Sequence, residues 1–176
     1  MDESARYFEM AAKTLDTYGQ PSKESYFNAG MTYMQMRNMR KAEKNLKMAV
    51  KIEPLFRPAH IKLASLYRDI GNPTKIQRHL QYAIQISPNL PDAYMYLADT
   101  YNNLKQFALA IEQYNKALAL SNHPDAIATI ACNLGDTYFN LKQTSNALES
   151  YSMGKSQEQA SPSAQSCSII GYLYAA

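Results

Sequence analysis

A pattern that recurs about every 34 residues constrains this chain more than any other feature of its sequence. Counted from the first residue of each unit, an apolar residue follows three positions later and a small residue four positions later. A tyrosine seven positions after the first residue closes the pattern. The opening residues are Tyr26, His60, Tyr94 and Ala131. The small residues are Gly30, Ala64, Ala98 and Gly135, and the closing tyrosines are Tyr33, Tyr67, Tyr101 and Tyr138. A period of this length with this order of residues predicts a helix–turn–helix repeat.

Proline and glycine set the boundaries of the predicted helices. Pro54 and Pro88 end helices because proline cannot continue a helix interior, and the Gly71-Asn72-Pro73 sequence predicts a turn between two helices. No segment has the pattern of a strand. The predicted helices lie at about 3–18, 22–36, 39–52, 57–70, 73–86, 91–104, 107–120, 125–141, 143–157 and 163–175.

This pattern resembles the tetratricopeptide repeat (TPR) family over roughly residues 22–157. The resemblance implies an all-α fold, a right-handed superhelical solenoid of antiparallel helix pairs. We expect one solenoid domain over residues 1–176. Its repeats would lie at about 23–56, 57–90, 91–127 and 128–160, with flanking helices at 3–18 and 163–175.

Small residues are predicted to mark the close contacts within each helix pair. Gly30 and Gly135 would let the second helix of the repeat approach, and large residues on that helix would fill the remaining space. The predicted small contacts on the second helices are Ala42, Ala110 and Ala147, and the large residues are Leu46, Leu80, Tyr114 and Tyr151.

Both ends of the sequence resemble parts of further repeats. The first predicted helix places Ala5, Phe8, Ala12 and Leu15 on one face, where a preceding repeat would have its second helix. The last predicted helix has the pattern of a first helix and exposes Ile169, Ile170, Leu173 and Tyr174. Two interpretations stay open, a piece of a longer array or a short protein with two capping helices. Self-association through these terminal helices is expected to cover the apolar face.

Catalysis is not expected from this sequence. It contains no phosphate-binding GxxxxGK[ST], no GxSxG and no HExxH sequence. His60 stands where the repeat needs a large residue, so it is interpreted as a packed histidine, while His79 and His123 are scattered elsewhere. Cys132 and Cys167 lack the CxxC spacing of a zinc site. We therefore expect no enzyme, no metal and no cofactor.

Hydropathy and charge near the N-terminus bear on localisation. No stretch approaches the 18 apolar residues of a membrane span, so no membrane insertion is expected. Asp2, Glu3 and Glu9 interrupt any signal-peptide pattern. These observations favour a cytoplasmic location.

Charge is distributed unevenly along the chain. Residues 1–88 hold 14 Lys and Arg against 8 Asp and Glu, a net charge of +6, whereas residues 89–176 hold 4 against 7, a net charge of −3. Much of the excess lies on one predicted helix and just before it, at Arg37, Arg40, Lys41, Lys44, Lys47 and Lys51. These residues could form a docking patch for an acidic partner or for phosphate, or simply a solvated outer face. Nucleic acid is not an expected partner, because the pI is only about 8.7 and the tyrosines occupy core positions of the repeat.

The resemblance also implies a partner-binding groove lined by the first helix of each repeat. Three positions of each first helix would point into it. These positions hold Phe27, Met31, Met34, Ile61, Ser65, Arg68, Met95, Asp99, Asn102, Cys132, Asp136 and Phe139, and all but Ser65 and Cys132 are candidate binding residues. The N-terminal part of this set is apolar and rich in adaptable methionine, and the C-terminal part is polar and acidic. The alternative is a groove filled by the protein's own repeats or capping helix.

One subclass of the family is disfavoured by particular residues. TPR domains that bind chaperone tails hold a terminal carboxylate with Lys, Asn and Arg in the groove. This chain has Phe27, Met31, Met95 and Asp99 at the corresponding places, and only Arg68, with Lys62 nearby, could serve. Binding of Hsp70 or Hsp90 tails is therefore not expected.

Three hypotheses for function remain. The first is a non-catalytic protein–protein interaction module that binds a peptide or a helix of an unidentified partner in its groove. The second is a set of scaffold repeats in a larger assembly, and the third is the TPR region of a longer enzyme.

Overall fold

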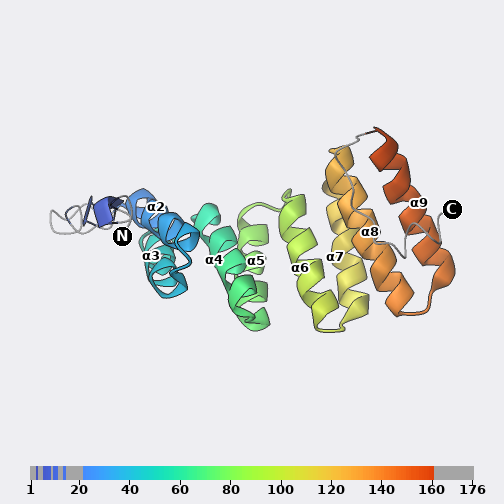
Figure 1. The fold of residues 1–176 in the computed structure, drawn as a ribbon, viewed down its shortest axis with the longest axis horizontal. Coiled ribbons are helices and arrows are strands. Elements are labelled where there is room, and N and C mark those ends of the chain that lie inside the picture. The colour runs from blue at the N-terminus through green and yellow to red at the C-terminus, as the bar shows by residue number, and fades with distance from the viewer. Residues whose placement is uncertain (1–2, 4–5, 9, 12–13, 15–21, 161–176) are drawn as a thin grey trace. The chain divides into compact units, whose positions relative to one another are not determined.

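A computed structural model describes residues 3, 6–8, 10–11, 14 and 22–160. Over residues 22–160 the chain is a succession of helices joined by short turns (Figure 1). These helices are α2 (Lys23–Gln35), α3 (Met39–Ile52), α4 (Arg57–Ile70), α5 (Pro73–Ile86), α6 (Pro91–Asn103), α7 (Phe107–Leu120), α8 (Pro124–Asn140) and α9 (Thr144–Ala160). Their bounds confirm the predicted helices between residues 22 and 157 to within three residues at every end. The predicted helix at 163–175, Ala5, Ala12 and Leu15 lie outside the described residues.

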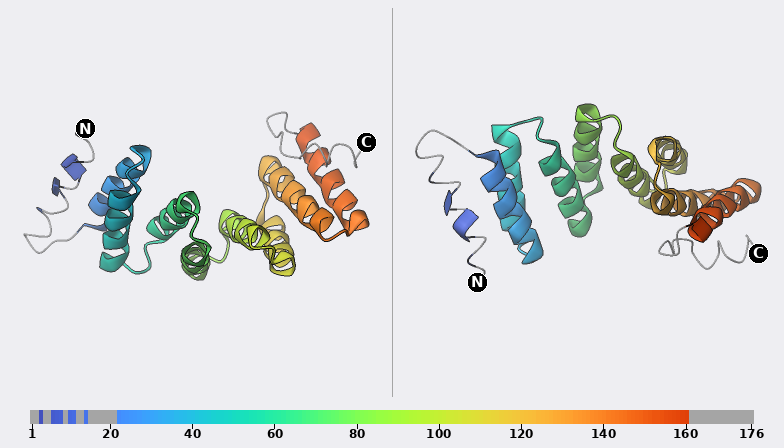
Figure 2. Two further views of the ribbon diagram at one scale, coloured as in Figure 1. Left: turned by 60° about the horizontal axis from the view of Figure 1, so that its bottom comes forward. Right: turned by 90° about the horizontal axis from the view of Figure 1, so that it is seen from above.

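The residues group into two compact units, and each is described by itself. Unit 1 is Met1–Pro88 and contains α2 to α5, and unit 2 is Asn89–Ala176 and contains α6 to α9. In each unit the helices pack as consecutive pairs, α2 with α3, α4 with α5, α6 with α7, and α8 with α9. Figures 1 and 2 show α8 and α9 side by side. The all-α helical-repeat prediction is confirmed, whereas a single domain over 1–176 stays a prediction.

Local signals in the sequence set the helix starts. The side chains of Ser22, Asn38 and Asn72 cap α2, α3 and α5, each accepting a hydrogen bond from a backbone N–H three residues later. Proline stands in the first turn of α4, α5, α6 and α8, where its missing N–H leaves no helical hydrogen bond unmade. Pro54 and Pro88 lie two residues beyond the ends of α3 and α5, as predicted.

The turn within each of the four described helix pairs has the same geometry. One residue adopts a left-handed conformation, namely Arg37 (φ 59°), Gly71 (φ 76°), Lys105 (φ 58°) and Lys142 (φ 60°). The next backbone N–H then donates to the carbonyl of the tyrosine that closes the sequence pattern. The donors Asn38, Asn72, Gln106 and Gln143 reach Tyr33, Tyr67, Tyr101 and Tyr138 at 2.9 to 3.0 Å. The backbone carbonyl of the closing tyrosine therefore takes part in the turn that ends the first helix.

Glycine makes room for a large side chain of the second helix. A Cβ added at Gly30 would lie 2.7 Å from Cγ of Leu46, and one added at Gly135 would lie 2.5 Å from the ring of Tyr151. Both partners are fully buried. The predicted contacts between small and large residues are thus confirmed at these two positions. Tyr33 and Tyr67 are buried as predicted, whereas Tyr101 and Tyr138 are half-buried and pack against the core of unit 2.

Candidate functional site

The candidate face of unit 1 is apolar and belongs partly to the packing of its own repeats. Phe27, Met31 and Met34 lie on α2 at intervals of four and three, so they share one side of the helix, and all are half-buried. The ring of Phe27 contacts Phe56 edge to face, with centroids 5.4 Å apart. This pair packs against the core around Tyr26. Phe27 therefore has a structural role besides any contact with a partner.

The neighbouring helix α4 contributes the remaining candidates of unit 1. Ile61 is half-buried, and Arg68 is exposed in the last turn of the helix. α2 and α4 contact one another directly, so their residues can act together.

The candidate face of unit 2 is built around two carboxylates held by buried tyrosines. The Tyr114 hydroxyl donates to Oδ1 of Asp99 at 2.6 Å, and the Asn133 amide donates to the same oxygen at 3.3 Å. The Tyr151 hydroxyl repeats this contact with Oδ1 of Asp136, also at 2.6 Å. Both aspartates were predicted to face a partner, and both are also hydrogen-bonded to the second helix of their own repeat.

Burial and the nearby carboxylate keep the Tyr114 phenol protonated. Burial is the main cause that raises its pKa, and the charge of Asp99 and its hydrogen bond raise the pKa further. The phenol therefore remains a donor over the whole physiological pH range.

The other candidates of unit 2 flank these carboxylates. Met95 and Asn102 lie on α6 with Asp99, and Phe139 lies in the last turn of α8; all are half-buried. The side-chain oxygen of Asn102 is itself buried and accepts no hydrogen bond from any residue that the structure describes. Cys132 on α8 is fully buried, so this residue does not lie open to a partner, and Cys167 lies outside the described residues.

Two histidines, separate in the sequence, meet between α4 and α5. His60 is only 2% exposed, so its interpretation as a packed histidine is confirmed. Its Nε2 lies 2.8 Å from the carbonyl oxygen of Pro54, and its Nδ1 lies 3.1 Å from Nδ1 of His79. Because a carbonyl oxygen only accepts, Nε2 of His60 carries a proton, and in the neutral pair His79 donates through Nδ1. Sequence analysis missed this pair, since the two residues belong to different helices.

A second missed cluster joins the first two repeats through Glu43. Oε1 of this carboxylate accepts from the Tyr67 hydroxyl at 2.7 Å and lies 2.6 Å from Nζ of Lys47 and 3.5 Å from Nζ of Lys75. The Lys47 hydrogen bond is the main cause that lowers the pKa of Glu43 to about 2, and the Tyr67 hydrogen bond lowers it further. His79 stacks on the ring of Tyr67, with centroids 5.5 Å apart. The two clusters are therefore continuous.

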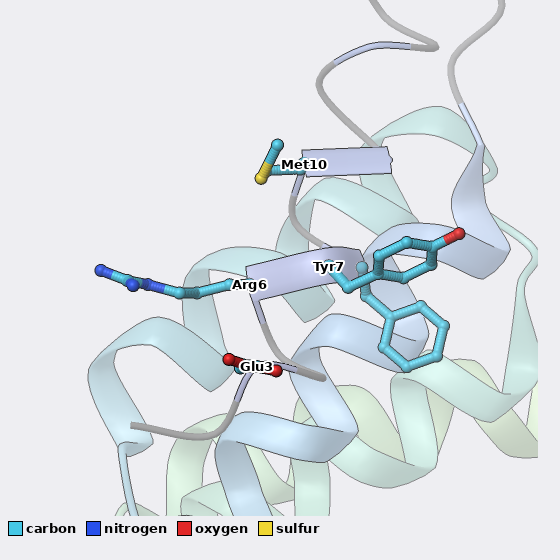
Figure 3. A pocket seen from close by; sticks show the side chains of 5 residues that line it. Glu3, Arg6, Tyr7 and Met10 are labelled. Carbon is cyan, nitrogen blue, oxygen red and sulfur yellow. The ribbon is translucent and has the colours of Figure 1, made fainter.

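The N-terminal segment lines a shallow hollow that shows no convergent polar groups. Its lining residues are Glu3, Arg6, Tyr7, Phe8 and Met10. Figure 3 shows the side chains of Arg6 and Tyr7 extending to different sides of the segment. Tyr7 and Met10 are mostly exposed. This hollow does not have the arrangement of a ligand site.

The described part of the chain has neither a metal-ligand group nor a membrane-spanning helix. No group of three or more His, Cys, Asp or Glu there could hold a metal ion. No helix formed by the described residues is long and apolar enough to cross a bilayer.

Comparison with known proteins identifies the repeat. A family model described as tetratricopeptide repeat matches residues 23–54, 91–124 and 128–152. The matched ranges leave out residues 55–90, where α4 and α5 nevertheless form a helix pair. No curated protein matches the chain by sequence.

Solved structures share the fold at low sequence identity. A crystal structure of MamA is 23% identical with a TM-score of 0.80, and the match covers 90% of this chain and 89% of MamA. PilF of Pseudomonas aeruginosa is 20% identical with a TM-score of 0.68, covering 81% of this chain and 64% of PilF. TTC0263, a TPR protein of Thermus thermophilus, is 19% identical with a TM-score of 0.65, covering 97% and 88%.

Proposed function

Because this chain belongs to the tetratricopeptide repeat family, we propose that it is a protein-binding module whose first helices take up a peptide or a helix of a partner. TPR repeats generally bind proteins and do not catalyse reactions. Each unit has its own face for this purpose. α2 and α4 form the apolar face of unit 1, and α6 and α8 form the polar face of unit 2.

The observation that carries this proposal is the buried side-chain oxygen of Asn102. A buried acceptor without a donor costs about 1–3 kcal/mol, and native proteins rarely tolerate one without a use for it. Rotation of the Asn102 side chain, which as a whole is half-buried, would bring this oxygen to the backbone N–H of a bound peptide. Met95 and Asp99 lie seven and three residues before Asn102 on α6, so all three lie toward the same side of the helix.

Unit 1 would supply apolar contacts to the same partner or to a second segment of it. Met31 and Met34 present flexible thioether side chains beside Phe27 and Ile61, and such side chains adapt to irregular surfaces. Each large apolar side chain contributes about 1.5–3 kcal/mol when a partner desolvates it fully.

The test begins with a partner captured by the purified chain and identified by mass spectrometry, whose affinity is then measured by calorimetry. Asn102→Ala should weaken binding about tenfold, whereas the free energy of unfolding without partner should stay unchanged or increase. Asn103→Ala is the matched control, since this neighbouring amide is exposed. Equal affinities for Asn102→Ala and wild type would contradict the assigned role of Asn102.

A second pair of variants tests the face of unit 1. Phe27→Ala with Met31→Ala should weaken binding strongly. Leu109→Ala with Leu148→Ala is the control, because these leucines are exposed on the second helices α7 and α9. A partner that loses affinity only with the leucine variant would place the binding surface on the second helices. Sedimentation without partner separates this proposal from the scaffold alternative, since scaffold repeats are expected to self-associate through their open terminal helices.

A further inference from the structure

The second helices of unit 1 carry a group of exposed basic side chains, which we call the basic face. Its members are Arg40, Lys44, Lys47, Lys51, Lys75 and Arg78. The four on α3 follow one another at intervals of four, three and four residues, so they form a single stripe along that helix. Lys75 and Arg78 are one turn apart on α5.

Glu43 joins the two helices of the basic face. Lys47 of α3 and Lys75 of α5 both reach Oε1 of this carboxylate, at 2.6 and 3.5 Å. The Tyr67 hydroxyl donates to the same oxygen. The Glu43 carboxylate thus lies between two lysine ammonium groups and a phenol. This arrangement indicates that the surface can bind a carboxylate.

The positive charge of the basic face is largely uncompensated. Glu43 is the only acidic residue of α3. Arg40, Lys44, Lys51 and Arg78 form no ion pair with any described residue. The acidic side chains of Glu24 and Glu53 pair instead with Lys23. Together with the net charge of +6 over residues 1–88, this leaves a surface that attracts anions.

We propose that the basic face is a docking surface for a protein segment rich in Asp and Glu. It is separate from the candidate groove, because it belongs to α3 and α5 whereas the groove residues of unit 1 belong to α2 and α4. An acidic segment can present carboxylates to the free cations of the stripe in the way that Glu43 meets Lys47 and Lys75.

The aromatic residues near the basic face favour a protein over a nucleic acid. Single-stranded nucleic acids bind through a basic groove with aromatic rings on which bases stack. Tyr82, one turn beyond Arg78, is the one exposed tyrosine of α5, at 40%, whereas Tyr33 and Tyr67 are buried, at 2% and 1% exposed. Lys41 and Lys75 lie over these two rings, at 5.0 and 4.6 Å from the centroids. The described residues of the basic face therefore lack the row of exposed rings on which successive bases stack.

The pKa of His79 should report binding of an acidic segment at the basic face. Burial is the main cause that lowers its pKa to about 4. The neighbouring groups that lower the pKa further are His60, Arg78, Lys47 and Lys75. An acidic segment bound on these cations would offset part of their charge, and the pKa of His79 would rise.

The experiment uses the full chain and a fluorescein-labelled oligoglutamate peptide, with binding measured by fluorescence anisotropy at low salt. Lys44→Gln with Lys51→Gln should weaken binding about fivefold, since each exposed ion pair contributes up to about 1 kcal/mol. Lys105→Gln with Lys142→Gln removes the same charge from unit 2 and should change affinity less than about twofold. Raising salt from about 50 to 200 mM should weaken binding of the wild type.

Two further measurements locate the bound peptide. In NMR titrations with pH, saturating peptide should raise the pKa of the His79 ring, assigned by comparison with His79→Gln. Phe27→Ala with Met31→Ala should bind the peptide like wild type, which separates this surface from the groove. The proposal is overturned by absence of binding, by equal losses in the two lysine variants, or by an unchanged pKa of His79. A single-stranded oligonucleotide or phosphatidylserine vesicle that binds more tightly than the peptide would assign the surface to another class of partner.

Discussion

The hydroxyl of Tyr151 donates a 2.6 Å hydrogen bond to the carboxylate of Asp136, the residue that follows the glycine against which the tyrosine ring packs. The missing side chain at Gly135 lets the ring lie close to α8, and this position brings the hydroxyl to the neighbouring carboxylate. Tyr114 and Asp99 make the same contact one repeat earlier. Asp99 and Asp136 therefore link the two helices of their repeats.

Removal of either hydroxyl should destabilise unit 2. Tyr151→Phe or Tyr114→Phe deletes a buried hydrogen bond to a charged group, which is expected to lower the free energy of unfolding by about 1.5–3 kcal/mol. Tyr82→Phe is the control, because Tyr82 is 40% exposed and should change stability by less than about 0.5 kcal/mol. Urea unfolding measures the three values. Similar stabilities for all three variants would show that the hydrogen bonds contribute nothing.

Overpacking at Gly135 should loosen the last repeat. Gly135→Leu forces atoms into the space of the Tyr151 ring, where even a Cβ would lie at 2.5 Å, and a loss of roughly 1–3 kcal/mol or more is expected. Repeats couple mainly to their neighbours, so the damage should begin locally. Thermal unfolding followed by tyrosine fluorescence tests this. An unchanged midpoint is incompatible with a close contact at Gly135.

Two substitutions in the left-handed turns should change the free energy of unfolding in opposite directions. Loss of the glycine at position 71 should destabilise the chain, and a glycine introduced at position 142 should stabilise it. Gly71→Ala meets no atom within 4 Å, so its expected cost of about 1 kcal/mol comes from the φ of 76° alone. Lys142→Gly relieves the same strain at φ 60° and should stabilise the chain by less than about 1 kcal/mol. Chemical denaturation of wild type and both variants measures these changes in the free energy of unfolding. A neutral Gly71→Ala would show that the turn tolerates a side chain without strain.

Acid should destabilise unit 1 in two stages. The pKa of His79 is lowered from 6.5 to about 4, so between these values the unfolded chain binds more protons and stability falls as pH falls. The pKa of Glu43 is lowered from 4.5 to about 2, so its contribution is lost as pH falls further through that range. Unfolding free energies at pH 7, 5.5 and 4.5 test the first stage. His79→Gln should flatten the dependence above pH 4.5, and a variant as steep as wild type would assign the effect to other groups.

The repeat pattern predicts most of the backbone because the same few residues set helix ends, turns and close contacts in every unit. Proline and asparagine near the helix starts were sufficient to place α5 to within a residue. The contact between Gly30 and Leu46 follows from the same periodicity, since it fixes which residues face the partner helix.

The polar clusters could not be predicted in this way. His60 and His79 are 19 residues apart, and Glu43 and Tyr67 are 24 apart, neither of which is a spacing of the repeat. Periodicity indicates that a residue faces another helix, but the rotamer and the partner depend on the packed structure. For the same reason Asp99 and Asp136 were predicted to line a binding face, whereas their hydrogen bonds to tyrosine were not predicted.

The repeated turn of unit 2 has a consequence for protein engineering. Leu104-Lys105-Gln106 and Leu141-Lys142-Gln143 have the same residues, the same left-handed lysine and hydrogen bonds at the same offsets. The two turns therefore offer equivalent backbone junctions for splicing. Joining Gln106 directly to Thr144 would excise one 37-residue segment and preserve the backbone junction. The splice would set Ala98 in place of Gly135 opposite Tyr151, so it needs Ala98→Gly to keep the space for that ring.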